Sequence, residues 1–140
     1  MTTGTIYSIG HSTLPLLKFL ANLQRHHIGI LVDVRSIPKS RWFPQYNQAA
    51  LEKALTERGV KYVWQGQHLG GKRQNIDFAG GIAWLAALIK LSKKRVAMLC
   101  SEGDFRFCHR HTHIEPALKA YGIRTIHILR TGGLRLPKIR

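Results

Sequence analysis

Short apolar runs rich in β-branched residues alternate with segments of helical periodicity along nearly the whole chain, and this alternation constrains the fold more than any other feature. The apolar runs lie at residues 5–9, 30–34, 60–64, 95–100 and 123–129. Helical spacing lies between them, at residues 16–26, 48–58, 82–91 and 109–121. Strands alternating with helices form βαβ units and a parallel sheet covered on both faces. The sequence therefore predicts an α/β three-layer sandwich with a mainly parallel sheet of about five strands.

Several local features of these elements can be predicted. Thr13 is placed to cap the first helix, and the glycine pair 80–81 is expected to precede the third. Pro116 cannot donate a backbone hydrogen bond, so the last helical segment is expected to break near residues 114–115. The run at 60–64 shows alternation over only a few residues, so it could also be an edge strand running the other way.

The length of 140 residues and the 44% share of hydrophobic residues suit one domain. We expect that domain over residues 1–130, followed by a basic tail, 131–140, without periodicity. No stretch approaches the roughly eighteen apolar residues of a membrane span, and the N-terminus lacks a secretory pattern. A soluble, cytoplasmic protein without a membrane partner is expected. Its two cysteines, Cys100 and Cys108, are accordingly expected to be free thiols.

The charge balance is strongly basic. Lys and Arg total 22 against 7 Asp and Glu, which gives a net charge of +15. Such a surface attracts polyanions, so nucleic acid or a phosphate-bearing small molecule is a candidate partner. The alternative is a solvated basic surface with no specific partner. No helix-turn-helix, zinc-finger or RNA-recognition motif decides between them.

Right-handed crossovers place all βα loops of a parallel sheet at one edge, where ligands bind in α/β proteins. Four loops of this chain should therefore converge into one basic cleft. They contain His11 and the residues 35–41, 68–73 and 100–110.

The densest group of reactive residues runs from Cys100 to Arg110. Cys100 follows a buried strand and precedes a helical segment amid Arg and His residues, which should lower the pKa of its thiol and make it a nucleophile. Glu102 could act with it as general acid or base, and His11 is a further catalytic candidate. Cys100 and Arg106 also have the C-x5-R spacing of a phosphate-binding loop. The alternative is that Cys100 is a small buried hydrophobic residue.

A metal site is the second interpretation of the same residues. Cys100, Cys108 and His109, with His11 or His113, offer the soft and imidazole ligands suited to zinc. The eight-residue gap between the cysteines is not that of a zinc knuckle, and the neighbouring Arg would repel a cation. We therefore assign no metal ligands and leave the cofactor unknown.

An anion site is predicted from cationic side chains and from glycines that let backbone amides approach, namely Arg35, Arg41, His11, Gly10, Gly70 and Gly71. The alternative is a set of internal ion pairs. Asp33 could hold either Arg35 or Arg41, and Glu102 could hold Arg110. The seven acidic residues are too few to pair every arginine, which favours at least one anion-binding role.

Three aromatic residues lie in the loop that carries these arginines. Trp42, Phe43 and Tyr46 could stack nucleobases beside the positive charges, or they could pack the loop onto the core.

The motifs resemble those of the DUF488 family in identity and order. They are 9–12 (Ile-Gly-His-Ser), 33–35 (Asp-Val-Arg) with Pro38 and Ser40-Arg41, 69–71 (Leu-Gly-Gly), and Cys100-x-Glu102 followed by Cys108-His109-Arg110. The resemblance extends from about residue 6 to 128, with departures at Ser101 and Pro116. It implies one compact α/β domain without an established substrate. Its motif residues Ser40, Cys108, His109 and Arg110 join the predicted anion or substrate site.

Together, these observations favour a cytoplasmic enzyme that acts on a nucleotide or nucleic acid, or another phosphate-bearing substrate, through Cys100 and Glu102. A non-catalytic nucleic-acid-binding domain with structural cysteines remains the alternative, beside the Cys/His zinc site.

Overall fold

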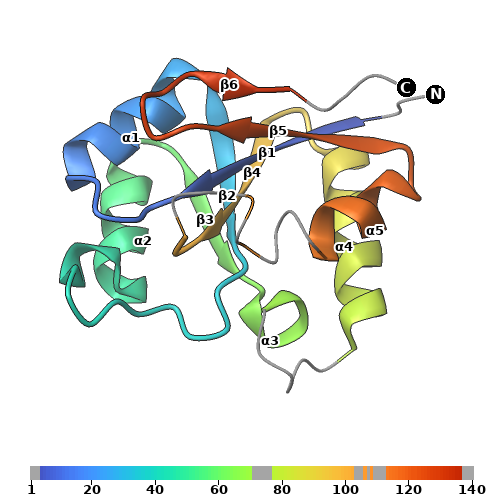
Figure 1. The fold of residues 1–140 in the computed structure, drawn as a ribbon, viewed down its shortest axis with the longest axis horizontal. Coiled ribbons are helices and arrows are strands. Elements are labelled where there is room, and N and C mark those ends of the chain that lie inside the picture. Colours follow the sequence, from blue (N-terminus) through green and yellow to red (C-terminus); the bar gives the residue numbers. More distant parts are fainter. Residues whose placement is uncertain (1–3, 71–76, 103–105, 107, 109–112, 137–140) are drawn as a thin grey trace.

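A computed structural model describes residues 4–70, 77–102, 106, 108 and 113–136 of the chain. Its centre is one six-stranded sheet in the order β3-β2-β4-β1-β5-β6 (Figure 1). The strands are β1 Gly4–Gly10, β2 Ile28–Asp33, β3 Lys61–Trp64, β4 Arg95–Cys100, β5 Ile123–Ile128 and β6 Leu134–Arg135. The first five are parallel to their neighbours, and β6 pairs antiparallel with β5. The predicted fold class is confirmed.

Helices cover the sheet on both sides and bury both of its faces. They are α1 Leu16–Arg25, α2 Gln48–Glu57, α3 Gly66–Leu69, α4 Phe78–Leu91 and α5 Glu115–Lys119, with a 3-10 turn, η1, at Pro44–Tyr46. Helices α1 and α2 lie on one side of the sheet, and α4 and α5 lie on the other (Figure 1). Two apolar clusters result, one containing Leu23 and Leu55 and the other containing Leu85 and Leu118. Burial on both faces explains why the central strands are nearly continuous apolar runs.

The short run near Tyr62 is an edge strand that runs parallel to the rest of the sheet. Strand β3 pairs with β2 in parallel, with Leu31 opposite Tyr62. Helix α5 begins at Glu115 with Pro116 in its first turn, and residues 113–114 before it are π-helical, so the helix type changes at the place where a kink or break was expected. A proline there needs no amide partner within the helix.

Three local expectations were wrong. Thr13 does not cap α1, because the N-cap is Pro15 without a side-chain hydrogen bond. Glycines 80–81 lie inside α4, because Asp77 starts the helix earlier by accepting a hydrogen bond from the Gly80 amide at 2.9 Å. The loop after β3 contains the unpredicted helix α3. The first two errors lie at element boundaries, where local propensity is weakest as a guide.

Part of the expected tail also belongs to the sheet. The Leu129 amide donates to the Gly133 carbonyl at 2.8 Å, which closes a tight turn and returns the chain along β5 as β6. Gly132 has a φ of +90° in this turn, a conformation that glycine adopts without steric cost.

In the part of the chain that the structure describes, no helix combines the length and the apolar character needed to cross a membrane.

Candidate functional site

The carboxyl ends of β1, β4 and β2 lie side by side and bring three distant segments together. Gly10 is in register with Cys100, and Asp33 is in register with Leu99. The pairing continues past the strands, because the His11 amide donates to the Cys100 carbonyl at 3.1 Å and the Ser12 amide to the Ser101 carbonyl at 2.9 Å. The expected convergence at one sheet edge therefore holds for the segments of His11, Arg35 and Cys100.

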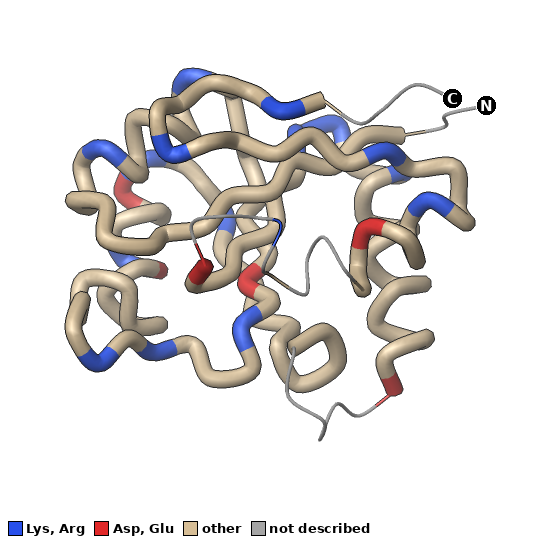
Figure 2. Tube along the Cα trace, in the orientation of Figure 1, with Lys and Arg blue, Asp and Glu red and all other residues tan. Residues whose placement is uncertain are grey.

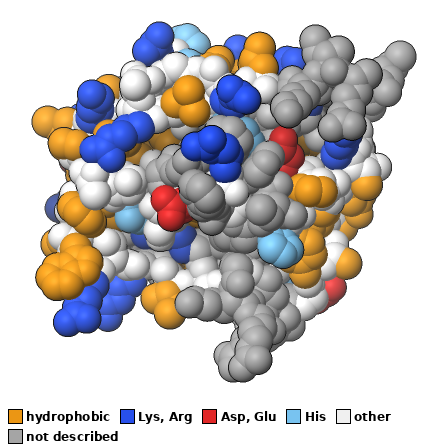
Figure 3. All heavy atoms as spheres, viewed as in Figure 1, with side chains coloured by type: hydrophobic (Ala, Val, Ile, Leu, Met, Phe, Trp, Pro, Cys, Tyr) orange, Lys and Arg blue, Asp and Glu red, His pale blue; other side chains and the backbone are white. Residues whose placement is uncertain are grey.

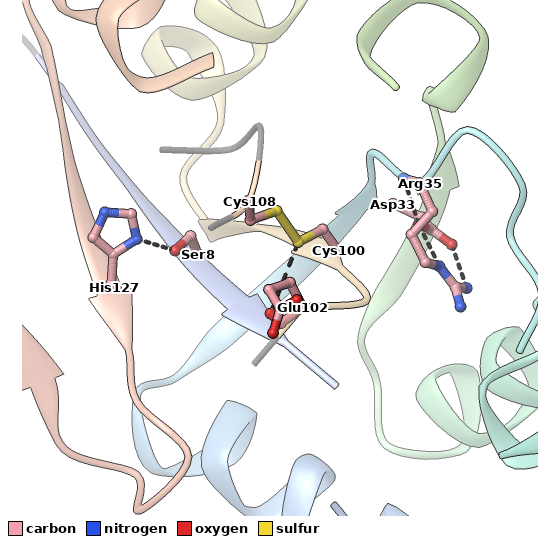
Figure 4. Close-up of a disulfide and its surroundings, with 7 residues drawn as sticks. All are labelled: Ser8, Asp33, Arg35, Cys100, Glu102, Cys108 and His127. Atoms are coloured by element: carbon pink, nitrogen blue, oxygen red, sulfur yellow. Dashed lines mark hydrogen bonds and ion pairs between the residues drawn. A yellow bond between two sulfur atoms is a disulfide. The ribbon is translucent and has the colours of Figure 1, made fainter. Parts of the chain in front are cut away.

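Cys100 and Cys108 form a disulfide across this edge (Figure 4). The expectation of free thiols was wrong, because the Cys108 sulfur is bonded to that of Cys100 at the end of β4. Both cysteines are buried among the apolar residues under α4 and α5. The Cys100 sulfur also lies 3.9 Å from the Glu102 carbonyl oxygen. In this oxidised state Cys100 is neither a nucleophile nor a thiolate facing Arg106, which is exposed.

Arg35 is part of an internal ion pair. Its Nη2 and Nε lie 2.7 and 2.9 Å from the two carboxylate oxygens of Asp33, and Nη1 donates to the Tyr46 carbonyl at 2.8 Å. The Tyr62 hydroxyl donates to the same carboxylate at 2.5 Å, and burial raises the pKa of Tyr62 so that its proton stays in place. Arg35 is only 3% exposed and Asp33 is fully buried. This arrangement corresponds to the ion-pair alternative rather than to an open anion site.

His11 is a buried histidine with one unoccupied nitrogen. Its ring stacks on Tyr46 with 4.3 Å between centroids, and its Nδ1 lies 3.0 Å from the Ser12 carbonyl. A carbonyl only accepts, so Nδ1 carries the proton and Nε2 presents a lone pair. Within the described part of the chain, Nε2 is buried without a hydrogen-bond partner. Burial is the main cause that lowers the pKa of His11, and Arg35 lowers it further against the opposing effects of Ser12 and Asp33.

Tyr46 joins His11 to the loop between β2 and α2. Its hydroxyl donates to the Leu14 carbonyl at 2.5 Å, and burial raises its pKa to about 12. Its ring is fully buried and also meets Phe19 edge-on. Tyr46 therefore packs the loop onto the core, which was the alternative to base stacking for the aromatic residues of this loop.

Ser40, Arg41 and Gly70 were also predicted to bind an anion, and each has a different environment in the structure. Ser40 closes the loop, since its hydroxyl accepts from the Phe43 amide at 3.1 Å and its amide donates to Asn47 at 2.7 Å. Arg41 is exposed, with its guanidinium carbon 5.1 Å from the centre of the Trp42 ring. Gly70 is buried so tightly that a Cβ there would lie 2.1 Å from the Ser36 hydroxyl.

His68 lines a different hollow, of about 220 Å³, at the start of α4. The lining residues are Gln65, His68, Asp77, Gly80, Gly81 and Trp84. Glu102 is exposed beside the disulfide. The predicted site residues Gly71, His109 and Arg110 lie outside the described residues, so the proposed Glu102–Arg110 pair does too.

The described residues contain no group of three metal-ligating side chains. The zinc interpretation relied on Cys100 and Cys108, and the disulfide uses both of their sulfur atoms.

A buried polar chain beside the disulfide was missed by sequence reasoning. The Ser8 hydroxyl hydrogen-bonds to His127 Nδ1 (Figure 4). His127 Nε2 lies 2.9 Å from a Glu115 carboxylate oxygen. Ser8 and His127 are opposite each other in the β1–β5 register. The available signal was a polar residue within each of two strands, Ser8 in β1 and His127 in β5, but pairing them requires the register.

Basic side chains are spread over the molecule rather than gathered only at the strand ends. Lys and Arg occur on the helices, on the sheet edges and along the loop from β2 to α2 (Figure 2). They outnumber acidic side chains on the face shown in Figure 3.

Residues 15–81 match the family model described as domain of unknown function DUF488. The matched range contains the motif residues 33–41 and 69–71 and ends before Cys100. No curated protein matches the chain.

Proposed function

We propose that the chain, whose residues 15–81 match the DUF488 family model, is a cytoplasmic enzyme that acts on a phosphate-bearing substrate through reduced Cys100. The single observation that supports this proposal best is the backbone pairing of His11 with Cys100 at 3.1 Å. It brings a buried imidazole with an open Nε2 to the segment of the candidate nucleophile. Neutral imidazole is the commonest general base in proteins.

In the proposed reaction, reduction of the Cys100–Cys108 disulfide first releases the thiol. A reducing compartment such as the cytoplasm favours that dithiol form. Cys100 then transfers its proton to His11 and attacks the phosphorus, so that an S–P bond forms as the P–O bond to the leaving group breaks and the leaving oxygen takes the proton from His11. Exposed Glu102 next acts as general base on the water that hydrolyses the thiophosphate and frees Cys100. The phosphate of the substrate is attracted by the net charge of +15 rather than by Arg35, whose donors face Asp33 and Tyr46.

The test is the alkylation rate of Cys100. In the C108S variant Cys100 is the sole cysteine, so labelling with iodoacetamide at pH 7 reports on it alone. We expect the folded variant to react faster than the same variant unfolded in urea, and we expect H11Q to reduce that difference. A folded rate equal to or below the unfolded rate would remove the nucleophile role.

A non-catalytic nucleic-acid-binding domain is the second candidate, and the disulfide is the observation that favours it. Buried between β4 and the segment before α5, the bond fits structural cysteines. This function requires that the C100S/C108S variant bind oligonucleotides as the wild type does. It also requires that the folded C108S variant show no enhanced thiol reactivity.

A further inference from the structure

Trp42 is exposed to an unusual degree for the largest apolar side chain. Its exposed fraction is 75%, against 37% for Trp84, while Trp64 is half-buried and donates to the Arg35 carbonyl at 2.8 Å. A single exposed apolar residue needs no special explanation. Trp42 differs because of the loop that presents it and the charges beside it.

The loop from β2 to α2 is held at both ends and closed in its middle. Arg35 and Tyr46 join its two ends through the hydrogen bond from Nη1 to the Tyr46 carbonyl. The Gln48 amide donates to the Pro38 carbonyl at 2.9 Å, and Ser40 bonds to both Asn47 and Phe43. The loop therefore presents Trp42 from a preformed frame, which reduces the entropy cost of binding.

The neighbours of Trp42 divide between the core and the solvent. Phe43 packs against the apolar cluster under α1 and α2, whereas Arg41 and Lys39 are exposed. The Arg41 guanidinium lies 5.1 Å from the centre of the Trp42 ring and covers one of its faces. The 75% exposure of Trp42 gives a planar ligand access to the ring. Apolar and basic side chains lie together at the lower left of Figure 3, over the loop from β2 to α2 and over α2.

We infer that Trp42 is a base-stacking platform for single-stranded nucleic acid, with Arg41 and Lys39 contacting the adjacent phosphates. An aromatic ring beside cations on a rigid loop is the arrangement that binds single strands with little sequence preference. The net charge of +15 complements a polyanion and disfavours a basic or purely apolar partner. The binding of single-stranded nucleic acid at Trp42 is inferred independently of the proposed enzyme. The further step, that this nucleic acid is also the substrate, rests on the proposed function.

The anchored loop links this platform to the candidate site. Tyr46, four residues after Trp42, stacks directly on His11. Arg35, at the other end of the loop, lies next to the ends of β2 and β4. A nucleic-acid strand held at Trp42 would thus contact a loop whose two end residues, Arg35 and Tyr46, lie near His11.

The experiment measures the binding of a fluorescein-labelled twelve-nucleotide deoxythymidine strand by anisotropy across a NaCl series. At fixed salt we expect W42A to weaken binding by about tenfold, W42F to retain most of the affinity, and W84A to match the wild type. We expect R41A to reduce the salt slope by about 0.7, the contribution of one phosphate contact.

Several outcomes would overturn the inference. They are wild-type affinity in W42A, equal or tighter binding of a duplex of the same length, and no binding by the wild type at low salt. Sedimentation of W42A as a smaller species than the wild type would assign the ring to contact between two copies instead. Thiol alkylation of Cys100 in the W42A/C108S variant separates failure of this inference from failure of the proposed enzyme, because alkylation by iodoacetamide requires no bound nucleic acid.

Discussion

At the scale of single residues, Arg35 illustrates how burial changes the role of a charged side chain. Its guanidinium faces Asp33 and the Tyr46 carbonyl with only 3% exposure. Removing one partner of such a pair leaves an uncompensated buried charge, which costs more than the pair itself contributes. Arg35 therefore positions the loop and β2, while Arg41 on the same loop faces the solvent.

We predict that R35M and D33N each lower the free energy of unfolding by about 3–5 kcal/mol. Urea denaturation followed by circular dichroism measures this loss. R41M is the matched control, because substitution of an exposed residue changes stability by about 0.5 kcal/mol or less. If R35M unfolds at the same urea concentration as R41M, the buried pair does not support the fold.

His11 makes stability depend on pH. Burial lowers the pKa of the folded imidazole below the 6.5 of an unfolded chain, so the unfolded state binds protons first as pH falls. The contribution of neutral His11 is complete above pH 6.5 and declines as pH falls below that value. Wild type should therefore lose more stability than H11Q between pH 7 and pH 5.

Urea midpoints of both proteins across that pH range test the prediction. H27N, which changes an exposed histidine, is the control and should follow the wild type. Parallel curves for wild type and H11Q would contradict the assigned effect of burial.

At the scale of elements, two connections hold α5 and the segment before it to the sheet. The disulfide joins the end of β4 to Cys108, and the chain from Ser8 through His127 to Glu115 joins β1 and β5 to α5. Helix α5 has only five residues, too few for stability on its own. These contacts and the packing of Leu118 therefore position it.

Reduction of the disulfide should lower stability. A cross-link with a sequence separation of 8 restricts the unfolded chain. Such a short loop corresponds to about 2–3 kcal/mol in the chain-entropy description. We expect the urea midpoint of the wild type to fall when a phosphine reductant is added. The C100S/C108S variant should be insensitive to the reductant, and equal insensitivity of the wild type would show that the bond stabilises nothing.

At the scale of the whole molecule, the net charge of +15 is the dominant property. Like charges spread over a small protein repel one another and destabilise its compact state. Salt shortens the range of this repulsion from about 30 Å at 0.01 M to about 10 Å at 0.1 M. The same screening weakens the attraction of a polyanionic ligand, so fold stability and nucleic-acid affinity should respond to salt in opposite directions.

We therefore predict that the melting temperature rises as NaCl increases from low to moderate concentration. In the K18E/K53E/K93E variant, three exposed lysines become acidic and the net charge falls by six, from +15 to +9. Its melting temperature should depend less on salt than that of the wild type. A flat or falling salt profile for the wild type, measured by calorimetry, would contradict the repulsion argument.

The sequence by itself determined the type of the main elements, the parallel sheet and the meeting of three of its loops at one edge. Strand and helix periodicities are local properties, and the crossover rule then places the segments of His11, Arg35 and Cys100 together without knowledge of any contact. The boundaries at Thr13 and Gly80 were less predictable, because neighbouring side chains and backbone strain decide them.

Only the tertiary structure decided what the side chains at that edge do. Asp33 had two candidate arginine partners, Arg35 and Arg41. The structure pairs it with buried Arg35, which also donates to the Tyr46 carbonyl, while the Tyr62 hydroxyl donates to Asp33. Cys100 is bonded to Cys108, which their spacing in the sequence does not encode. Ser8 hydrogen-bonds to His127 because the register of β1 and β5 places the two residues opposite each other. Ion pairing, disulfide formation and burial depend on distances between residues far apart in sequence, and those distances exist only once the sheet and its two helical layers have assembled.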